Sequence, residues 1–358
     1  MLLILTIFLF LLQPFCFFYS YHKKRYLNQN FQIMKKLLIF TLLLTSFIQL
    51  SCNPETISNT PPTNPVDVYV AGSKNGKACY WKNNQLVMLD SGVFTDTYLR
   101  KVVVSNGNLY AFGHGTYNIN SNYTLLWKNG VLSDLETQLN TTNYAYFRID
   151  DMEIEGNDEY FIGSYGNQSL TEAKTAYWKN GVKTIVTDGL TYYNTPKFKV
   201  KNNNVYVVFN FNATNGGYYL NGIFNSVLDT GLGGFGINNN DVYVIGYKAN
   251  TQTEGYYINT TNNSETIIPS ISSISFLFFD NNNIYYSDSQ KIFKNGNLIY
   301  QTLIETITIS DLIVQDDVLY KIAGTEINNQ TKIVQINDTT IMTEGTNEHF
   351  NSLFIVQN

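Results

Sequence analysis

The chain has 358 residues, of which 44% are hydrophobic, 15% aromatic and only 14% charged. Because charged residues supply about a quarter of an average globular chain, solubility here depends on neutral polar residues such as Asn, Ser and Thr. This composition excludes a coiled coil, a charged disordered chain and a disulfide scaffold. A formal net charge of −5, without a block of Lys or Arg, also argues against nucleic acid as a partner.

The N-terminal region has the composition of an export signal. An apolar run, Leu37–Leu50, follows Met34-Lys35-Lys36 and ends just before Cys52. A positive start, a short apolar stretch and small residues before a cleavage point are typical of a secretory signal peptide. The run is short for a transmembrane helix, which needs about 20 residues. We therefore predict a signal peptide over residues 34–51.

The cysteine at the end of this segment resembles the lipobox cysteine of bacterial lipoproteins. In that family the cysteine becomes the first residue of the mature chain and carries acyl groups. The resemblance implies that Cys52 is lipidated and that the protein is anchored to the bacterial outer membrane, on its periplasmic or cell-surface side. A plain signal peptide followed by an incidental cysteine is the alternative.

Residues 1–33 precede this complete export signal and contain a further apolar run, Met1–Phe18. We expect an upstream start codon chosen in error, with Met34 as the true start. A genuine extra membrane segment is the alternative, and Gln13 and Pro14 near the end of the run disfavour it.

Removal of residues 1–51 leaves 18 basic and 28 acidic residues, a net charge of −10. Residues 52–65 contain four of the seven prolines together with Asn, Thr and Ser, and such a segment forms an extended, semi-rigid tether. With Cys52 acylated, Cys79 has no partner within the mature chain, so we expect a buried or half-buried thiol.

The remainder, residues 66–358, is a repeat. An Asn/Asp turn is followed by a strand with an anchor tyrosine and a final glycine, at Asp67–Gly72, Asn108–Gly113, Asp158–Gly163 and Asp241–Gly246, with weaker copies around Tyr206, Tyr285 and Tyr320. Two apolar residues lie six and eight positions before most anchor tyrosines, as one face of a strand requires. A second phrase ends in the Asn-Gly dipeptide of a tight hairpin and recurs at Leu126–Gly130, Tyr177–Gly181, Tyr218–Gly222 and Ile292–Gly296, with an Asn-Asn ending at Tyr80–Asn84. A fourth strand follows each hairpin, as at Gln85–Leu89, Val131–Leu135 and Val182–Val186.

Each repeat therefore contains four antiparallel strands in about 42 residues, which is typical of a propeller blade. The first repeat lacks the strand before its turn, and Ser352–Gln357 has the right spacing to supply it. We predict an all-β, seven-bladed β-propeller of four-stranded antiparallel blades, closed by the C-terminal strand completing the N-terminal blade. No stretch with a helical period is expected in the mature chain.

The second phrase, Tyr177-Trp178-Lys179-Asn180-Gly181 in its clearest copy, resembles the repeats of a family of bacterial lipoproteins. The resemblance covers residues 66–340 and implies a β-propeller. It supplies no activity or ligand, because the signatures of kelch and WD40 blades are missing.

Catalytic and metal-binding residues are scarce. Nucleophilic catalysis with a histidine base could use only His114 or His349 in the mature chain. We expect His114 to be a solvated side chain at a loop tip beyond the second strand of its blade. Zinc would need four Cys or His ligands, and we expect no metal, no cofactor and no enzymatic activity. Asn/Asp runs such as Asp280–Asn283 fit turn chemistry better than calcium binding.

The strands expected to face the propeller axis carry charged residues in two adjacent repeats. Asp151 and Glu153 lie in one repeat and Lys197 and Lys199 in the next, with Arg148 further upstream. These five residues form either a set of ion pairs between blades or a polar ligand site at the mouth of a central funnel. They are our candidate site residues.

Two other features have a structural explanation. Trp81, Trp127 and Trp178 occupy a fixed place in the repeat, so packing between blades is more plausible than stacking on a sugar. The Asn-x-Ser/Thr sequons are explained by the high Asn and Thr content of the chain, and we expect no glycosylation at them.

These observations favour a lipid-anchored binding or scaffold propeller of the cell envelope, without catalysis and without nucleic acid. A protein or glycan would bind on the face formed by the loops, and we expect a monomer. The alternatives are a carbohydrate-active propeller enzyme, which needs two converging carboxylates, and a structural component of an outer-membrane assembly complex.

Overall fold

A computed structural model describes residues 66–117, 122–133, 135–141, 143–167, 169, 173–188, 196–209, 217–227, 230–239, 241–248, 254–268, 271, 273–302, 307–324 and 331–358. The predictions for residues 1–33, the signal peptide 34–51, Cys52 and the tether 52–65 lie outside the described residues. The chain divides into two compact units, residues 1–56 and 57–358, and all described residues belong to the second. None of its described helices has the length and hydropathy needed to cross a bilayer.

The described strands make four-stranded antiparallel groups, which we call units I to VII. Unit I contains β28 (Glu348–Gln357), β1 (Val66–Lys74), β2 (Lys77–Lys82) and β3 (Gln85–Met88). Unit II contains β4 (Asp96–Ser105), β5 (Asn108–Thr116), β6 (Asn122–Lys128) and β7 (Val131–Ser133), and unit III contains β8 (Tyr146–Glu155), β9 (Asp158–Gly166), β10 (Lys174–Lys179) and β11 (Val182–Asp188). Unit IV contains β12 (Lys197–Lys201), β13 (Asn204–Val208), β14 (Gly217–Leu220) and β15 (Ile223–Ser226).

The last three units follow the same order of strands. Unit V contains β16 (Thr230–Asn238), β17 (Asp241–Lys248), β18 (Gly255–Asn259) and β19 (Glu265–Ile268), and unit VI contains β20 (Phe276–Asp280), β21 (Asn283–Ser287), β22 (Lys291–Lys294) and β23 (Asn297–Gln301). Unit VII contains β24 (Thr308–Gln315), β25 (Val318–Gly324), β26 (Ile333–Ile336) and β27 (Thr339–Thr343). Units V and VI are joined into one eight-stranded sheet by a short parallel pairing of β16 with β20.

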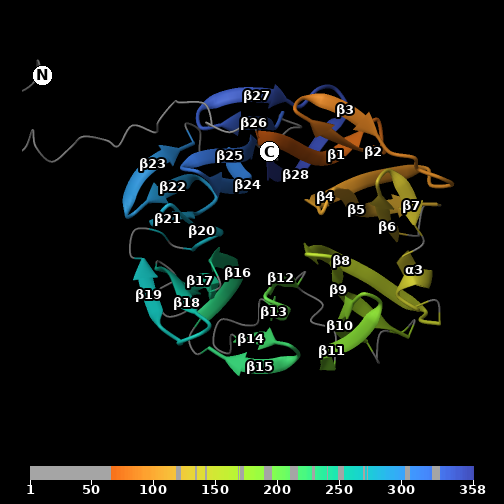
Figure 1. The fold of residues 1–358 in the computed structure, drawn as a ribbon, viewed down its shortest axis with the longest axis horizontal. Helices are drawn as coiled ribbons and strands as arrows, with labels where there is room; N and C mark the ends of the chain where they lie inside the picture. The colour runs from red at the N-terminus through yellow and green to blue at the C-terminus, as the bar shows by residue number, and fades with distance from the viewer. Residues whose placement is uncertain are drawn as a thin grey trace, which may run out of the picture. The chain divides into compact units, whose positions relative to one another are not determined.

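These units follow one another around a common centre, with the first strand of each unit innermost (Figure 1). This arrangement confirms the predicted all-β propeller of four-stranded antiparallel sheets. Seven blades were predicted. The sheets give this number when units V and VI, which share one eight-stranded sheet, are counted as two blades. The only described helix is α3 (Leu135–Gln138), a single turn after β7, so the strand predicted over Val131–Leu135 was too long.

The C-terminal strand closes the ring, as predicted. β28 pairs antiparallel with β1 along its whole length, from Val66 opposite Gln357 to Lys74 opposite Glu348. Phe350 of β28 is fully buried and meets Trp81 edge-on, with ring centroids 4.8 Å apart. The first and last strands of the fold therefore protect each other's edges.

In six of the seven units the asparagine of the second hairpin has two roles, which explains why it recurs. Its backbone adopts a positive φ near 50°, as a tight hairpin requires, at Asn83, Asn129, Asn180, Asn221, Asn295 and Asn337. Its side-chain oxygen also accepts a hydrogen bond from a backbone N–H near the start of the second strand of the same unit, at Val68, Leu109, Glu159, Val205, Ile284 and Leu319. Asn tolerates the left-handed region and carries an acceptor, so the repeat signature is structural.

The aromatic residues of the repeat fill the spaces between units. Trp81, Trp127 and Trp178 are at most 4% exposed and belong to clusters that join neighbouring units, which confirms packing and leaves no face for a sugar. The lysine that follows each tryptophan lies over the anchor tyrosine, for example Lys179 at 5.2 Å from the Tyr160 ring. The thiol of Cys79 is fully buried, as predicted.

A β-bulge interrupts the innermost strand of five units at the same place. The register shifts lie between Leu99 and Lys101, Ile149 and Asp151, Leu232 and Gly234, Ile309 and Asp311, and opposite Ala71 and Gly72 in unit I. The glycine three residues after the anchor tyrosine lies directly beneath the bulge in units I, II, III and V. At Gly163, an added Cβ would lie 2.0 Å from the carbonyl oxygen of Arg148, so the recurring glycine is required by this close approach.

We predict that Gly163→Ala destabilises the protein by about 2–3 kcal/mol, because the bulge must move away from the new methyl group. Gly234→Ala is the matched control, since its Cβ would meet only Ile245 side-chain atoms, at 3.6 Å and beyond. Urea unfolding of both variants measures the difference. Equal unfolding free energies would contradict this role for Gly163.

Candidate functional site

The innermost strands enclose a cavity of about 780 Å³ at the centre of the ring. The extra residue of each bulge lines it, at Arg100, Asp150, Gly233, Ser310 and Asn351. Bulges re-aim side chains and are frequent next to functional sites. Here they turn one residue from each of five units toward the same space.

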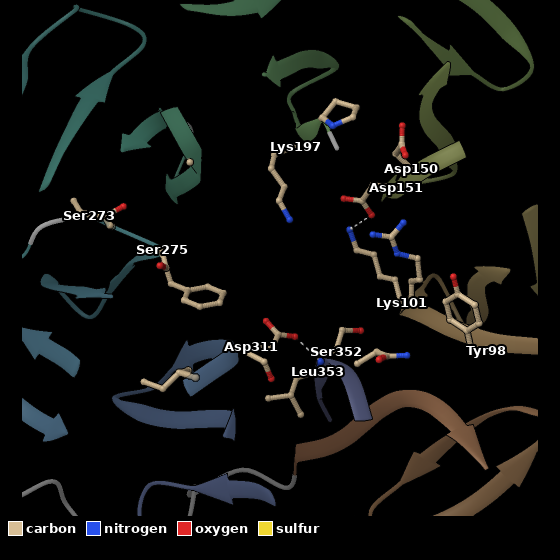
Figure 2. Close-up of a pocket in the computed structure, with 18 residues that line it drawn as sticks. Tyr98, Lys101, Asp150, Asp151, Lys197, Ser273, Ser275, Asp311, Ser352 and Leu353 are labelled. Carbon is tan, nitrogen blue, oxygen red and sulfur yellow. Dashed lines mark hydrogen bonds and ion pairs between the residues drawn. The ribbon is translucent and has the colours of Figure 1, made fainter. Parts of the chain in front are cut away.

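A second set of lining residues comes from the position just after the bulge, or from its equivalent in units IV and VI, which have no bulge. These positions are equivalent in the different units, because each lies two residues before the residue that pairs with an anchor tyrosine. Those that line the cavity are Lys101, Asp151, Lys197, Phe276, Asp311 and Ser352. Figure 2 shows the side chains of Lys197, Asp151, Lys101 and Asp311 pointing into one space.

Two of the five predicted site residues, Glu153 and Lys199, pair with each other and do not line the cavity. Glu153 accepts from Lys199 at 3.1 Å and from Lys101 of unit II at 3.0 Å, so one carboxylate connects units II, III and IV. Burial opposes the charge of Glu153, but the two ammonium groups outweigh it and lower its pKa. These contacts match the ion-pair interpretation of the charged strands.

The other three predicted residues lie at or near the cavity wall. Asp151 lines the cavity and accepts from Lys101 at 3.1 Å, and Lys197 lines it with no such partner among the described residues. Arg148 is half exposed and its Nε lies 2.8 Å from Oδ1 of Asp150, which does line the cavity. The sequence therefore indicated which strands carry charged residues near the cavity. It did not distinguish the residues that form ion pairs between units, Glu153 and Lys199, from those that line the cavity, Asp151 and Lys197.

Two carboxyl groups of the cavity wall have raised pKa values. Burial raises the pKa of Asp311 to about 6, although the backbone N–H groups of Leu353 and Leu312 donate to it at 2.6 and 2.9 Å. Burial likewise raises the pKa of Asp150 against the opposing charge of Arg148, and Oδ2 of Asp150 is buried without a hydrogen-bond partner in the part of the chain that the structure describes.

The prediction for His114 was wrong. The residue lies within β5, is 6% exposed, and packs between the rings of Tyr98 and Phe112. Burial, together with the charges of Arg100 and Arg148, lowers its pKa to about 4. His349 is exposed, with Nδ1 4.0 Å from a Glu344 oxygen.

The bulge residues and Asp311 were missed, although the sequence carries a signal for them. A further buried apolar residue lies eleven positions before the anchor tyrosine, at Leu99, Ile149, Leu232 and Ile309. It precedes the next buried apolar position by three residues, and a regular strand would space them by two. An extra residue must therefore bulge out between them.

Within the described ranges, no group of three or more His, Cys, Asp or Glu side chains is placed to share a metal ion. The Asn/Asp turns predicted as turn chemistry adopt positive φ, including Asn281, Asn282, Asp316 and Asp317. The cavity therefore has to be interpreted from its charges, hydroxyl groups and apolar surface.

Comparison with known proteins supports the fold alone. No family model and no curated protein matches the chain. A puromycin-hydrolyzing peptidase from Mycobacterium tuberculosis is similar, with a TM-score of 0.51 and 9% identity over 81% of this chain and 55% of that one. A quinonprotein alcohol dehydrogenase-like protein from Bacteroides thetaiotaomicron gives 0.48 and 12%, over 81% and 77%. The Dos1 propeller gives 0.44 and 10%, over 76% and 80%.

We predict that Glu153→Gln and Lys199→Met are strongly coupled in a double-mutant cycle. The coupling free energy should be about 1–2 kcal/mol, because Glu153→Gln leaves Lys199 without a carboxylate partner and Lys199→Met removes one of the two ammonium groups that Glu153 contacts. The pair of Lys128 and Glu159, at 2.8 Å and with Lys128 45% exposed, is the control and should give less than about 0.5 kcal/mol. Equal coupling in the two pairs would contradict a structural role for Glu153.

We also predict a pH-dependent contribution of Asp311 to stability. Its folded-state pKa of about 6 exceeds the ordinary value of 3.8, so the folded protein binds this proton more tightly than the unfolded chain. The tighter proton binding adds up to about 3 kcal/mol to the free energy of unfolding. This stabilisation is fully present below about pH 4 and is lost as the pH rises through 6.

This contribution is measured by comparing unfolding free energies at pH 4.5 and 7.5. The loss with rising pH should be smaller in Asp311→Asn than in the wild type. It should be unchanged in Asp316→Asn, a control in a turn where Asn also tolerates the positive φ. Identical pH dependence of the wild type and Asp311→Asn would refute the prediction.

Proposed function

We propose that this protein is a lipid-anchored binding propeller of the bacterial envelope that holds a polar ligand in its central cavity. The observation that carries the proposal is the cavity itself, about 780 Å³ in volume and lined by charged and polar groups, several of them at the bulges of the innermost strands. Ligand sites of proteins commonly have volumes of about 300–1,000 Å³ and a few convergent polar groups. The volume favours a small molecule or the end of a glycan over a folded protein.

The lipid anchor is proposed from the sequence. It depends on Cys52 following an apolar segment directly, and on a proline-rich tether between Cys52 and β1. Such an anchor would hold the propeller at the outer membrane, on its periplasmic or cell-surface side.

A carbohydrate-active enzyme is the second candidate. It is favoured by Asp150 and Asp311, because general acid catalysis needs a carboxyl group with a raised pKa and both groups line the cavity. Release of reducing ends from envelope glycans, abolished in Asp150→Asn and Asp311→Asn, would favour the enzyme over the binding module.

The binding function is tested by filling the cavity. A Cβ on Gly233 would meet only the carbonyl oxygens of Ile274 and Ile245, at 3.4 and 3.8 Å, so this position of the wall has room for a side chain. In a saturation-transfer NMR screen of polar metabolites and glycans, we expect ligands that bind the wild type and Gly233→Ala but not Gly233→Trp. Ligands that bind Gly233→Trp as well as the wild type would show that the binding site lies outside the cavity.

The anchor is tested by metabolic labelling with palmitate in a bacterial host. We expect incorporation of the label into the wild type and none into Cys52→Ala, because the acyl chains need this thiol. Cys79→Ala is the control and should label normally, since this thiol is buried in the fold. Equal labelling of the wild type and Cys52→Ala would show that Cys52 is not the lipidation site.

A further inference from the structure

The cavity wall contains two cationic side chains that make no ion pair within the described part of the chain. Arg100 and Lys197 both line it, and neither makes an ion pair with any carboxylate of the described ranges. The Arg100 side chain contacts Nε2 of His114, at 3.5 Å, and His114 is neutral at pH 7 because its pKa is lowered to about 4.

The sector around these two residues is basic in an acidic protein. Among the residues of units II to IV that line the cavity, three are basic, Arg100, Lys101 and Lys197, and two are acidic, Asp150 and Asp151. The whole chain has a net charge of −5. A low-dielectric cavity with a local excess of positive charge attracts an anion, and Arg100 can bind a carboxylate with two parallel hydrogen bonds.

The same sector has an acceptor without a donor among the described residues. Oδ1 of Asp150 is occupied by Arg148 at 2.8 Å, whereas Oδ2 is buried and has no partner. The Asp150 side chain is 2% exposed, and the residue lines the cavity. Oγ of Ser352, another lining residue, is also buried without a partner in the described structure. Buried polar atoms are normally hydrogen-bonded, and a hydroxyl group of a ligand would supply these bonds.

The opposite wall, from units V to VII, has a different character. It combines Gly233 with three serines, Ser273, Ser275 and Ser310, and with the apolar surface of Phe276 and Ile309. Among the described residues of these units, Asp311 is the only charged one that lines the cavity. Short hydroxyl groups beside an apolar surface suit a ligand that has hydroxyl groups on its edges and C–H groups on its faces.

From these three observations we infer that the cavity binds an acidic sugar of the uronic acid class. The inference rests on the proposed function and names the chemical class of its ligand. The carboxylate of the sugar lies between Arg100 and Lys197, and a hydroxyl group donates to Oδ2 of Asp150. The remaining hydroxyl groups contact the serines and Asp311. An inorganic anion would use only the basic sector, and a neutral sugar would leave both cations unpaired.

Isothermal titration calorimetry on the full-length protein in mild detergent tests the inference. The probes are glucuronate and galacturonate, as monosaccharides and short oligomers, with glucose and galactose oligomers as neutral counterparts and inorganic sulfate as the simple anion. We expect at least one uronate to bind at least tenfold more tightly than its neutral counterpart. Arg100→Met and Lys197→Met should each weaken that binding at least tenfold. Lys201→Met, on the same strand as Lys197 but outside the cavity lining, should leave it unchanged.

Three outcomes overturn the inference. In the first, neutral sugars bind as tightly as uronates, and neither Arg100→Met nor Lys197→Met weakens the binding. In the second, sulfate binds as tightly as the best uronate. In the third outcome, no uronate binds, while other ligands from the NMR screen bind the wild type and are excluded by Gly233→Trp. In that case the proposed function stands and only the ligand class is wrong. Failure of every probe and every screened ligand would overturn both.

Discussion

The pairing of the last strand with the first is the interaction on which the rest of this fold depends. β28 supplies the innermost strand of unit I, and nine pairs join it to β1. It also supplies Asn351, Ser352 and Leu353 to the cavity wall. Neighbouring units hold it from both sides, since Asp311 of unit VII accepts from the N–H of Leu353 and Asn351 donates to the carbonyl oxygen of Leu99 in unit II. Without β28 the edge of β1 would be unpaired and the cavity would lack one wall.

Within the closed ring, a recurring bulge converts a structural strand into part of a site. Beyond the bulge, toward the end of the innermost strand, side chains keep the strict alternation that fills the spaces between units. At the bulge one residue is added, and it faces the common centre. The glycine beneath it, as at Gly113 and Gly163, gives the bulge room to approach. The structure thus separates two layers of charge. One contains the pairs of Glu153 with Lys101 and Lys199, and the other contains the unpaired cations Arg100 and Lys197 at the cavity wall.

The architecture could be predicted from the sequence because its determinants are local and repeated. The Asn-Gly hairpins, the anchor tyrosines and the apolar residues at a spacing of two all depend on short-range geometry, and the spacing of Ser352–Gln357 identified the closing strand. The site was predicted only in part, because a bulge changes the face to which a side chain points and alternation alone cannot locate it. Arg100, the extra residue of the bulge in β4, was missed for that reason. His114 was misplaced because β5 continues to Thr116, beyond the glycine that was taken as its end. The pairing of Glu153 depends on two neighbouring units, which no single repeat reveals.

The C-terminal strand closes the ring and thereby maintains the cavity. Equilibrium urea unfolding of the full-length protein and of a variant lacking residues 350–358, followed by tryptophan fluorescence, tests this closure most directly. Loss of the buried Phe350 side chain would by itself cost about 3–5 kcal/mol, and the backbone pairing with β1 is lost as well. We expect the truncated protein to unfold at a much lower urea concentration or to be unfolded in buffer. An unfolding midpoint equal to that of the full-length protein would contradict closure by β28.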